Sequence, residues 1–96
     1  MFYVYIIQNL KNNLYIGFTG DLSNRIKEHQ RGECYTTKRL TGPWNLIYCE
    51  GCLDDTDAKK RERFLKTSKG REFIKNRLKY YLKINEKKLC VFHEDK

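Results

Sequence analysis

The sequence predicts an α+β domain: a small three-stranded antiparallel sheet flanked by helices, in the chain order β-β-α-β-α-α. Residues 3–7 and 14–17 form two apolar runs rich in β-branched and aromatic side chains, which is typical of strands. The polar, asparagine-rich residues between them favour a hairpin turn. After the second run the apolar residues recur at helical spacing, so we expect the hairpin to lead into a helix.

Side-chain alternation in this hairpin brings tyrosines together. Tyr3 and Tyr5 project to one face of the first strand, and Tyr15 and Gly17 project to one face of the second strand, because successive side chains of a strand point to opposite faces. The tyrosines of the two strands can therefore share a face of the sheet.

The first helix is predicted from its capping residues and its spacing. Asp21 is a good N-cap, and Gly32 suits the C-terminal end of the helix. Arg25 and His29 are four residues apart, a spacing that places two side chains on the same side of a helix. We therefore expect Arg25 and His29 to project together.

The remaining elements follow Pro43. Residues 44–50 are apolar on both faces of a predicted strand, so we expect this strand to be the central or best-covered one. A helix is predicted to open near Thr56 and to continue through residue 66. Residues 69–71 contain a glycine and are expected to break it, and residues 72–82 then have the spacing of an amphipathic helix.

Length and charge limit the possible functions. Ninety-six residues form one domain, and we assign residues 1–83 to it and residues 84–96 to a C-terminal extension. The 20 Lys and Arg against 12 Asp and Glu give a net charge of +8, which favours a polyanionic partner: DNA, RNA or an anionic membrane. No apolar run approaches the roughly 20 residues of a membrane span, and we expect a cytoplasmic protein with no membrane partner.

Basic residues are concentrated in the second half of the chain. Between residues 59 and 88 there are thirteen of the 20 cations and three acids, too uneven a ratio for the cations to be neutralised by ion pairs. We predict that this segment contacts phosphates, notably through Lys66, Lys69 and Arg71. Lys38 and Arg39, in the loop after the first helix, are either further phosphate ligands or merely solvated cations.

Five sequence elements together resemble the GIY-YIG nucleases, especially the small single-domain members. They are Tyr3-Val4-Tyr5, Tyr15-Ile16-Gly17, Arg25, His29 and a downstream helical Glu62. The resemblance extends over residues 2–79. The first triplet departs from the family pattern, with Tyr3 in place of Gly and Val4 in place of Ile, and both residues are compatible with a strand.

The resemblance implies a set of site residues. The implied catalytic residues are Tyr5, Tyr15, Arg25, His29 and Glu62. Glu62 would also be the metal ligand, for Mg²⁺ or Mn²⁺, although an ion pair with Lys66 one helical turn away is its alternative role. Gly17 is expected to leave room for the substrate backbone, and Asn76 is the candidate for a further polar residue that family members often carry after the metal ligand.

Phosphodiester hydrolysis gives each of these residues a role. The attacking water must lose a proton, and negative charge builds on the phosphate oxygens. Arg25 suits that charge. The general base is left open between Tyr5 and His29. A free phenol has a pKa of about 10, but a neighbouring guanidinium or metal ion lowers it. Tyr15 is expected to hydrogen-bond a phosphate oxygen or a metal-bound water.

The most specific hypothesis is a divalent-metal-dependent endonuclease that cleaves DNA and is structure-selective in DNA repair or processing. The main alternative is a nucleic-acid-binding module that is not catalytic, or a nuclease subunit whose protein partner supplies substrate recognition. Both alternatives bind DNA with strong salt dependence. Only the nuclease loses cleavage while retaining binding when Glu62 or Arg25 is replaced. The oligomeric state is left open.

Overall fold

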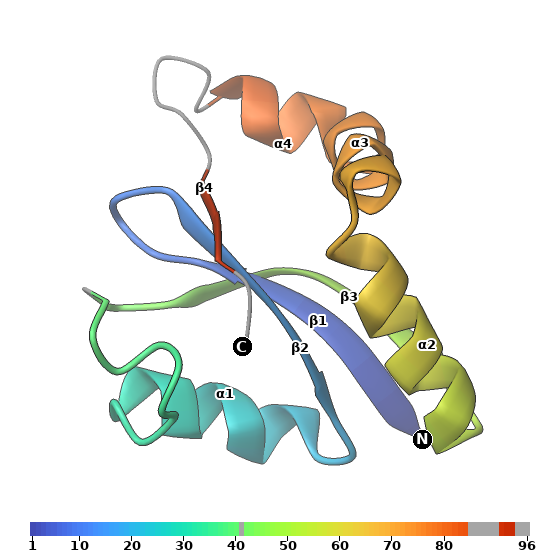
Figure 1. The fold of residues 1–96 in the computed structure, drawn as a ribbon. Coiled ribbons are helices and arrows are strands. Elements are labelled where there is room, and N and C mark those ends of the chain that lie inside the picture. Colours follow the sequence, from blue (N-terminus) through green and yellow to red (C-terminus); the bar gives the residue numbers. More distant parts are fainter. Residues whose placement is uncertain (41, 85–90, 94–96) are drawn as a thin grey trace.

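The structure is a computed structural model that describes residues 1–40, 42–84 and 91–93. It consists of two strands, a helix, a third strand, three further helices and a last short strand (Figure 1). In chain order these are β1 (Phe2–Gln8), β2 (Asn13–Thr19), α1 (Leu22–Gln30), β3 (Asn45–Cys52), α2 (Asp55–Leu65), α3 (Ser68–Arg77), α4 (Lys79–Ile84) and β4 (Val91–His93).

The sheet has the strand order β3-β1-β2-β4. β1 pairs antiparallel with both β2 and β3, so the predicted three-stranded antiparallel sheet is confirmed. β4 adds a short parallel strand beside the first three residues of β2. This strand lies within the predicted C-terminal extension.

The prediction that the third strand is central was wrong. β3 is an edge strand of the sheet, and β1 is the central strand of the antiparallel trio. Residues 4–7 of β1 are at most 1% exposed, whereas Leu46 on β3 is 42% exposed. The apolar residues of β3 did not identify the central strand, because an edge strand can also carry apolar side chains. The strand that is almost completely buried on both faces is β1.

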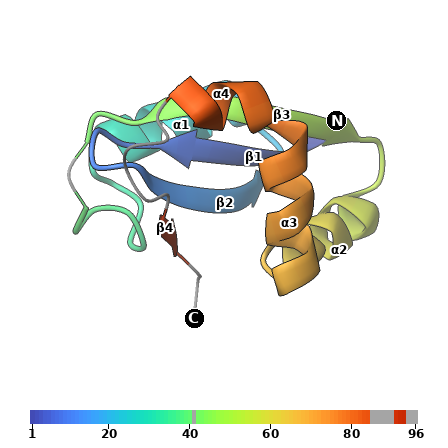
Figure 2. The same ribbon diagram turned by 90° about the horizontal axis from the view of Figure 1, so that it is seen from above.

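Helices cover the two faces of the sheet separately (Figures 1 and 2). On one face, Tyr5, Ile7 and Tyr15 pack with Trp44 and with apolar side chains of α1. On the other face, alternate residues of the same strands form the larger core with α2 and α3; its buried members are Val4, Ile6, Leu14, Ile16, Ala58, Leu65 and Ile74. Tyrosines of the hairpin therefore lie on the α1 side of the sheet.

Local sequence explains the hairpin and the first helix. The side chain of Asn9 accepts hydrogen bonds from the backbone N–H groups of Lys11 and Asn13, at 3.0 and 2.9 Å, and closes the turn. Asp21 caps α1 by accepting from the N–H of Asn24 at 3.2 Å. Gly32, with φ of +72°, follows the helix as predicted.

The junction between α2 and α3 differs from the prediction. Residues 69–71 do not break a helix. They belong to α3, whose N-cap Thr67 accepts from the N–H of Gly70 at 3.1 Å. A Cβ atom on Gly70 would lie 2.0 Å from the carbonyl oxygen of Phe64. The glycine therefore allows α3 to start against the backbone of α2, and it is not a helix breaker.

The helix predicted over residues 72–82 is interrupted. α3 ends at Arg77 and α4 begins at Lys79, with Leu78 between them at φ −107° and ψ 27°. The apolar spacing that predicted one helix continues through this break, because Leu78 still packs against the core. Spacing alone could not distinguish one helix from two.

Candidate active site

The tyrosines of the hairpin share a face, as predicted. Tyr5 lies opposite Gly17 in the β1–β2 pair, and Tyr15 lies opposite Ile7. The ring centroids of Tyr5 and Tyr15 are 6.3 Å apart. Both tyrosines are buried, Tyr5 completely and Tyr15 with 7% of its surface exposed.

His29 extends from α1 into the space between the two tyrosines. Its ring centroid is 5.7 Å from that of Tyr5 and 5.2 Å from that of Tyr15, and the residue is only 3% exposed. The hydroxyl of Tyr5 lies 2.7 Å from Nε2 of His29. A strong hydrogen bond at this distance couples the phenol to the imidazole.

The other nitrogen of His29 has a partner that the sequence did not predict. Oγ1 of Thr37 lies 2.7 Å from Nδ1 of His29, and Thr37 is 1% exposed. Sequence analysis had singled out only the basic residues of this loop, Lys38 and Arg39. The sequence shows a hydroxyl residue beside these two cations. The direction in which that hydroxyl points depends on the path of the loop, and no periodicity predicts that path.

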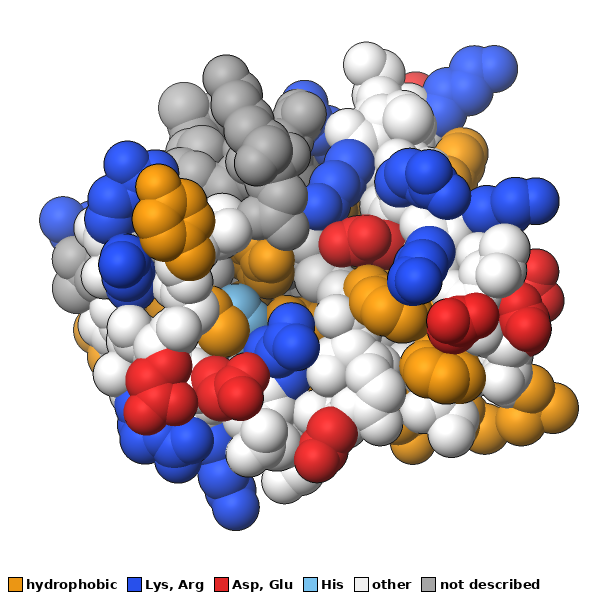
Figure 3. Space-filling view, turned by 60° about the horizontal axis from the view of Figure 1, so that its bottom comes forward, with side chains coloured by type: hydrophobic (Ala, Val, Ile, Leu, Met, Phe, Trp, Pro, Cys, Tyr) orange, Lys and Arg blue, Asp and Glu red, His pale blue; other side chains and the backbone are white. Residues whose placement is uncertain are grey.

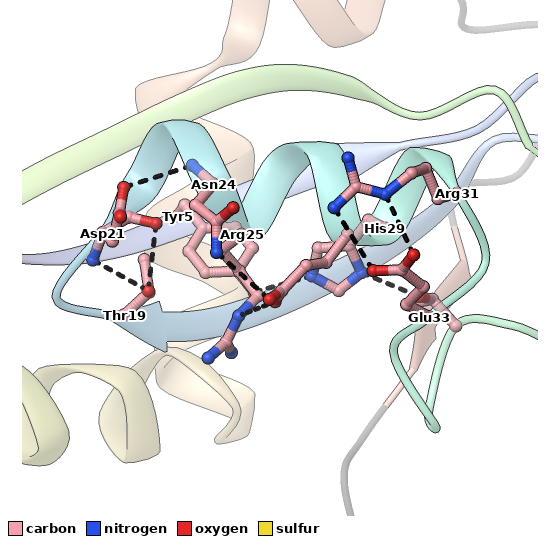
Figure 4. A network of polar contacts seen from close by, with 10 residues as sticks. Tyr5, Thr19, Asp21, Asn24, Arg25, His29, Arg31 and Glu33 are labelled. Carbon is pink, nitrogen blue, oxygen red and sulfur yellow. Dashed lines mark hydrogen bonds and ion pairs between the residues drawn. The ribbon is translucent and has the colours of Figure 1, made fainter.

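Arg25 lies one helical turn before His29, and both point toward Tyr5 (Figure 4). Nε of Arg25 is 2.9 Å from a carboxylate oxygen of Glu28, and 39% of the Arg25 side chain is exposed. Burial alone would lower the pKa of Arg25, but attraction and a hydrogen bond to Tyr5, with a contribution from Glu28, raise it overall. The guanidinium is thus a permanent cation between the phenol and the solvent.

The space that Gly17 leaves by lacking a side chain is filled by another residue of the protein. A Cβ atom on residue 17 would lie 2.4 Å from both the Cζ and the hydroxyl oxygen of Tyr5. Gly17 therefore makes room for the Tyr5 ring, and its predicted contact with the substrate backbone stays a prediction.

Glu62 lies on α2, which packs on the opposite face of the sheet from α1. Its carboxylate forms an ion pair with Lys66 at 3.3 Å, which is the alternative that the helical spacing also allowed. The side chains of Glu62 and Lys66 are 19% and 16% exposed. Tyr5, Tyr15 and His29 lie together with Arg25 beside them, and the carboxylate of Glu62 on α2 is paired with a lysine.

Glu62 could face the same substrate across the edge of β2. β4 covers β2 only at residues 13–15, and no other strand in the described part of the chain pairs with that edge further along. Lys59, one turn before Glu62, lies over the ring of Phe18 on β2 at 5.7 Å. This side of α2 thus runs beside β2 near Gly17.

The predicted phosphate ligands lie in two places. Lys38 and Arg39 are exposed in the loop after α1, with Nζ of Lys38 5.0 Å from the ring centroid of Tyr35. Lys66, Lys69 and Arg71 lie at the junction of α2 and α3. Figure 3 shows basic side chains on both sides of a hollow with histidine and hydrophobic side chains at its floor. Asn76 is exposed on α3.

The structure thus gathers tyrosine, arginine and histidine side chains beside the hairpin of a sheet flanked by helices. The model of the GIY-YIG catalytic domain matches residues 1–79. The chain therefore belongs to the GIY-YIG family, whose domain is that of an endonuclease, a hydrolase acting on nucleic acid.

The chain is similar to curated relatives over part of their length, 59% of it in the first of them. The chain is 40% identical over 67 residues to a UPF0213 protein of Desulfotalea psychrophila, a match that spans 67% of this chain and 59% of the relative. It is 38% identical over 66 residues to a UPF0213 protein of Clostridium perfringens, spanning 69% and 71% of the two chains. A UPF0213 protein of Staphylococcus aureus is 32% identical over 65 residues, spanning 68% and 79%.

No solved structure matches the chain significantly. Among the described residues, no helix combines the length and the apolar character needed to cross a membrane.

Proposed function

We propose that this protein is a divalent-metal-dependent nuclease that hydrolyses phosphodiester bonds of DNA, with RNA as the alternative substrate. The observation that carries the proposal is the convergence of Tyr5, Tyr15, Arg25 and His29 on one side of the hairpin. Their chemistry matches what the reaction needs: proton acceptance, hydrogen bonds to phosphate oxygens and a fixed positive charge.

Each of these residues has a distinct role in the proposed reaction. Arg25 stabilises the negative charge that builds on the phosphate oxygens, because its guanidinium stays protonated and partly exposed. The coupled pair of Tyr5 and His29 accepts the proton of the attacking water. Tyr15, the less buried phenol, donates a hydrogen bond to a phosphate oxygen.

The residues present fit a hard divalent cation bound mainly through water and substrate. Glu62 supplies one partly exposed carboxylate, and the described residues contain no cluster of three or more His, Cys, Asp or Glu that could enclose an ion. Mg²⁺ is commonly held by one or two carboxylates, retained waters and substrate phosphate. This donor set suits Mg²⁺ or Mn²⁺ rather than a protein-enclosed zinc ion.

Glu62 is the proposed metal ligand. Before its carboxylate can bind a metal ion, the ion pair with Lys66 must open. A metal ion bound there would supply positive charge to the phosphate and to the leaving oxygen. Lys66 would then be available to a neighbouring phosphate of the substrate. Lys69 and Arg71 follow it at the start of α3, and Lys38 and Arg39, exposed in the loop after α1, would be further phosphate ligands.

The biological setting belongs to the same proposal. A surface that contacts the nucleic-acid backbone suits a cytoplasmic enzyme that selects DNA structures, such as branched or nicked DNA in repair or processing, over sequences. Residues 1–83 form its nuclease domain, and a protein partner could supply further substrate recognition.

The decisive experiment incubates the protein with flap, nicked, single-stranded and duplex DNA in Mg²⁺ or Mn²⁺. We expect cleavage of at least one substrate, abolished by EDTA. Glu62→Gln should remove cleavage while binding is retained. Glu72→Gln is the matched control, because it makes the same change at an exposed acid on α3 and should leave cleavage unchanged.

A second function has one observation in its favour. Glu62 forms an ion pair with Lys66, as expected of a domain that binds nucleic acid without cutting it. That alternative predicts salt-dependent binding and no cleavage of any substrate in either metal ion. Binding of all four substrates without cleavage would therefore replace the nuclease proposal.

A further inference from the structure

The loop between α1 and β3 carries an exposed aromatic ring beside the candidate active site. Tyr35 in this loop is 75% exposed. Two residues later, Thr37 is 1% exposed, and its Oγ1 atom lies 2.7 Å from Nδ1 of His29. The chain therefore passes from a solvent-exposed ring to a direct contact with a site residue within two positions.

The residue before Tyr35 also lies close to the candidate site. Burial alone would lower the pKa of Arg25, and the interactions that raise it overall, led by those with Tyr5, include the charge of the Cys34 thiol. Cys34 thus lies within electrostatic range of the guanidinium. Because residues on both sides of Tyr35 are near the site, the exposed ring lies at its rim.

The backbone of this loop is held by contacts that do not involve the Tyr35 ring. The N–H of Lys38 donates to the carbonyl of Cys34 at 2.9 Å, and the N–H of Leu40 donates to the carbonyl of Thr37 at 3.0 Å. Leu40 also packs against the buried cluster on the α1 face of the sheet. The fold thus fixes the position of Tyr35 and leaves its ring exposed, so a ligand would bind it with little loss of backbone freedom.

Two cations adjoin the ring. Nζ of Lys38 lies 5.0 Å from the ring centroid of Tyr35, and Arg39 follows with an exposed side chain. Neither cation forms an ion pair with an acid in the part of the chain that the structure describes. Proteins bind single-stranded nucleic acid with this combination, because cations follow the phosphates while bases stack on aromatic rings.

A ring at this position favours bases that are not already stacked in a duplex. Inside a duplex, each base is covered on both faces by its neighbours, and a protein ring can contact its face only after the base is unpaired and displaced, which costs free energy. A flap or a single strand offers the face of a base without that cost.

We propose that Tyr35 stacks on an unpaired nucleobase next to the phosphate that is cut, while Lys38 and Arg39 contact phosphates of the same strand. This inference rests on the proposed nuclease function and names its substrate class. That class is nucleic acid with an unpaired nucleotide beside the scissile bond, as in a flap or a single strand, in preference to continuous duplex. Tyr35 is then a specificity-determining residue and takes no part in the chemical step.

The first test measures binding and needs no cleavage. Fluorescence anisotropy in EDTA compares a single-stranded oligonucleotide with a duplex of the same length. Tyr35→Ala should weaken single-strand binding by about 5-fold or more, as expected for the loss of one stacked base, and leave duplex binding nearly unchanged. Tyr35→Phe keeps the ring and should bind as the wild type does.

Tyr80→Ala is the matched control. Tyr80 is 78% exposed, and Nζ of Lys79 lies 6.0 Å from its ring centroid. The control therefore removes an equally exposed ring beside a lysine, but from α4. It should leave the binding of both nucleic acids unchanged. Thermal unfolding of all three variants should match the wild type, because each altered ring is exposed.

The second test locates the stacked base. A single strand that contains 5-iodouracil is irradiated in complex with the protein, which links the modified base to an aromatic ring in contact with it. Trypsin cleaves after Arg31 and Lys38 and releases residues 32–38, in which Tyr35 is the only aromatic residue. We expect mass spectrometry to find the linked base in this peptide of the wild type and not in that of Tyr35→Ala.

The outcomes separate this inference from the nuclease proposal. If Tyr35→Ala binds single strands as tightly as the wild type, or loses single-strand and duplex binding equally, the stacking role is wrong, and metal-dependent cleavage still decides the nuclease function. If Tyr35→Phe is as impaired as Tyr35→Ala, the ring is not the determinant and the inference also fails. If single-strand binding depends on Tyr35 but no DNA is cleaved in Mg²⁺ or Mn²⁺, the nuclease proposal fails and the stacking site stands.

Discussion

Gly17 lies directly opposite Tyr5 in the antiparallel pair, and a Cβ atom at residue 17 would be 2.4 Å from the Tyr5 hydroxyl oxygen. The phenol therefore reaches His29 by passing over a position that must lack a side chain. The register of the β1–β2 hairpin thus brings the glycine of the second triplet against the tyrosine of the first.

The first prediction follows from this contact. Gly17→Ala should displace the Tyr5 ring, break its 2.7 Å hydrogen bond to His29 and lower the free energy of unfolding by about 1–3 kcal/mol, the usual effect of overpacking. The rate of DNA cleavage should fall by more than the loss of folded protein accounts for. Urea denaturation and DNA cleavage assays measure the two effects.

Gly20→Ala is the matched control for this prediction. A Cβ atom at Gly20 would meet its nearest neighbour, the ring of Phe2, at 3.5 Å, an ordinary van der Waals contact. The control should keep both stability and activity close to wild type. Equal losses in the two variants would show that any added methyl group in this region is harmful and that the Tyr5 contact is not special.

Local sequence signals predicted much of this site. The period-two alternation placed Tyr5 and Tyr15 on one face, and the four-residue spacing placed Arg25 and His29 on one side of α1. These predictions succeeded because each depends on a single element or on one hairpin. Capping by Asp21 and termination at Gly32 are local for the same reason.

The features that the sequence did not predict depend on how distant segments pack. Thr37 lies in an irregular loop, so no periodicity shows which way its hydroxyl points. The central position of β1 is decided by helices covering both faces of the sheet, and the role of Gly70 by the close approach of α2. The sequence left Glu62 with two partners, a metal ion or Lys66, because its spacing suits the ion pair as well as the site.

The second prediction concerns the junction of α2 and α3. A Cβ atom on Gly70 would lie 2.0 Å from the carbonyl oxygen of Phe64 and 2.4 Å from Cα of Leu65. Backbone cannot move aside as a side chain can, so Gly70→Ala should destabilise the fold by about 2 kcal/mol or more, despite the better helix propensity of alanine. Chemical denaturation measures this loss.

Gly51→Ala is the informative comparison for Gly70. Its added Cβ would also be too close to a neighbour, at 2.3 Å from Sδ of Met1, but Met1 is a flexible terminal side chain with 62% exposure. We expect a loss below about 1 kcal/mol. If Gly51→Ala were as destabilising as Gly70→Ala, the distinction between backbone and side-chain obstruction would be wrong.

The third prediction is a dependence of stability on pH that arises at Glu50. Burial alone would raise the pKa of this carboxyl group, but hydrogen bonds from Arg61 and Tyr48, together with the charge of Arg61, lower it below its usual 4.5. Two bonds of 2.9 Å join Arg61 to Glu50. The unfolded chain therefore takes up this proton at a higher pH than the folded protein does.

The sign of the effect follows from that difference. The stability that Glu50 contributes is present above about pH 4.5 and is lost as the pH falls through the lower pKa of the folded state. Glu50→Gln should lower the free energy of unfolding at pH 7 by about 1–2 kcal/mol and flatten its decline below pH 4.5. Denaturation curves recorded from pH 3 to pH 7 test this.

An exposed ion pair gives the matched control for Glu50. Arg31 and Glu33 also form two hydrogen bonds, at 3.0 and 3.3 Å, but their side chains are 53% and 54% exposed. Solvent screens such a pair, so Glu33→Gln should change stability by a few tenths of a kcal/mol at most. A loss at Glu33 equal to that at Glu50 would contradict the argument from burial.

The last prediction concerns the nucleic-acid surface. Lys69 is exposed at the start of α3, whereas Arg31 is exposed but paired with Glu33. If Lys69 binds a phosphate, Lys69→Ala should weaken duplex binding about equally for unrelated sequences and reduce the slope of log K against log salt by about one. Arg31→Ala removes the same charge and should leave the slope almost unchanged.

Fluorescence anisotropy between roughly 50 and 200 mM salt measures both slopes. Equal effects would mean that binding responds to the net charge of the protein and not to a defined phosphate contact at α3.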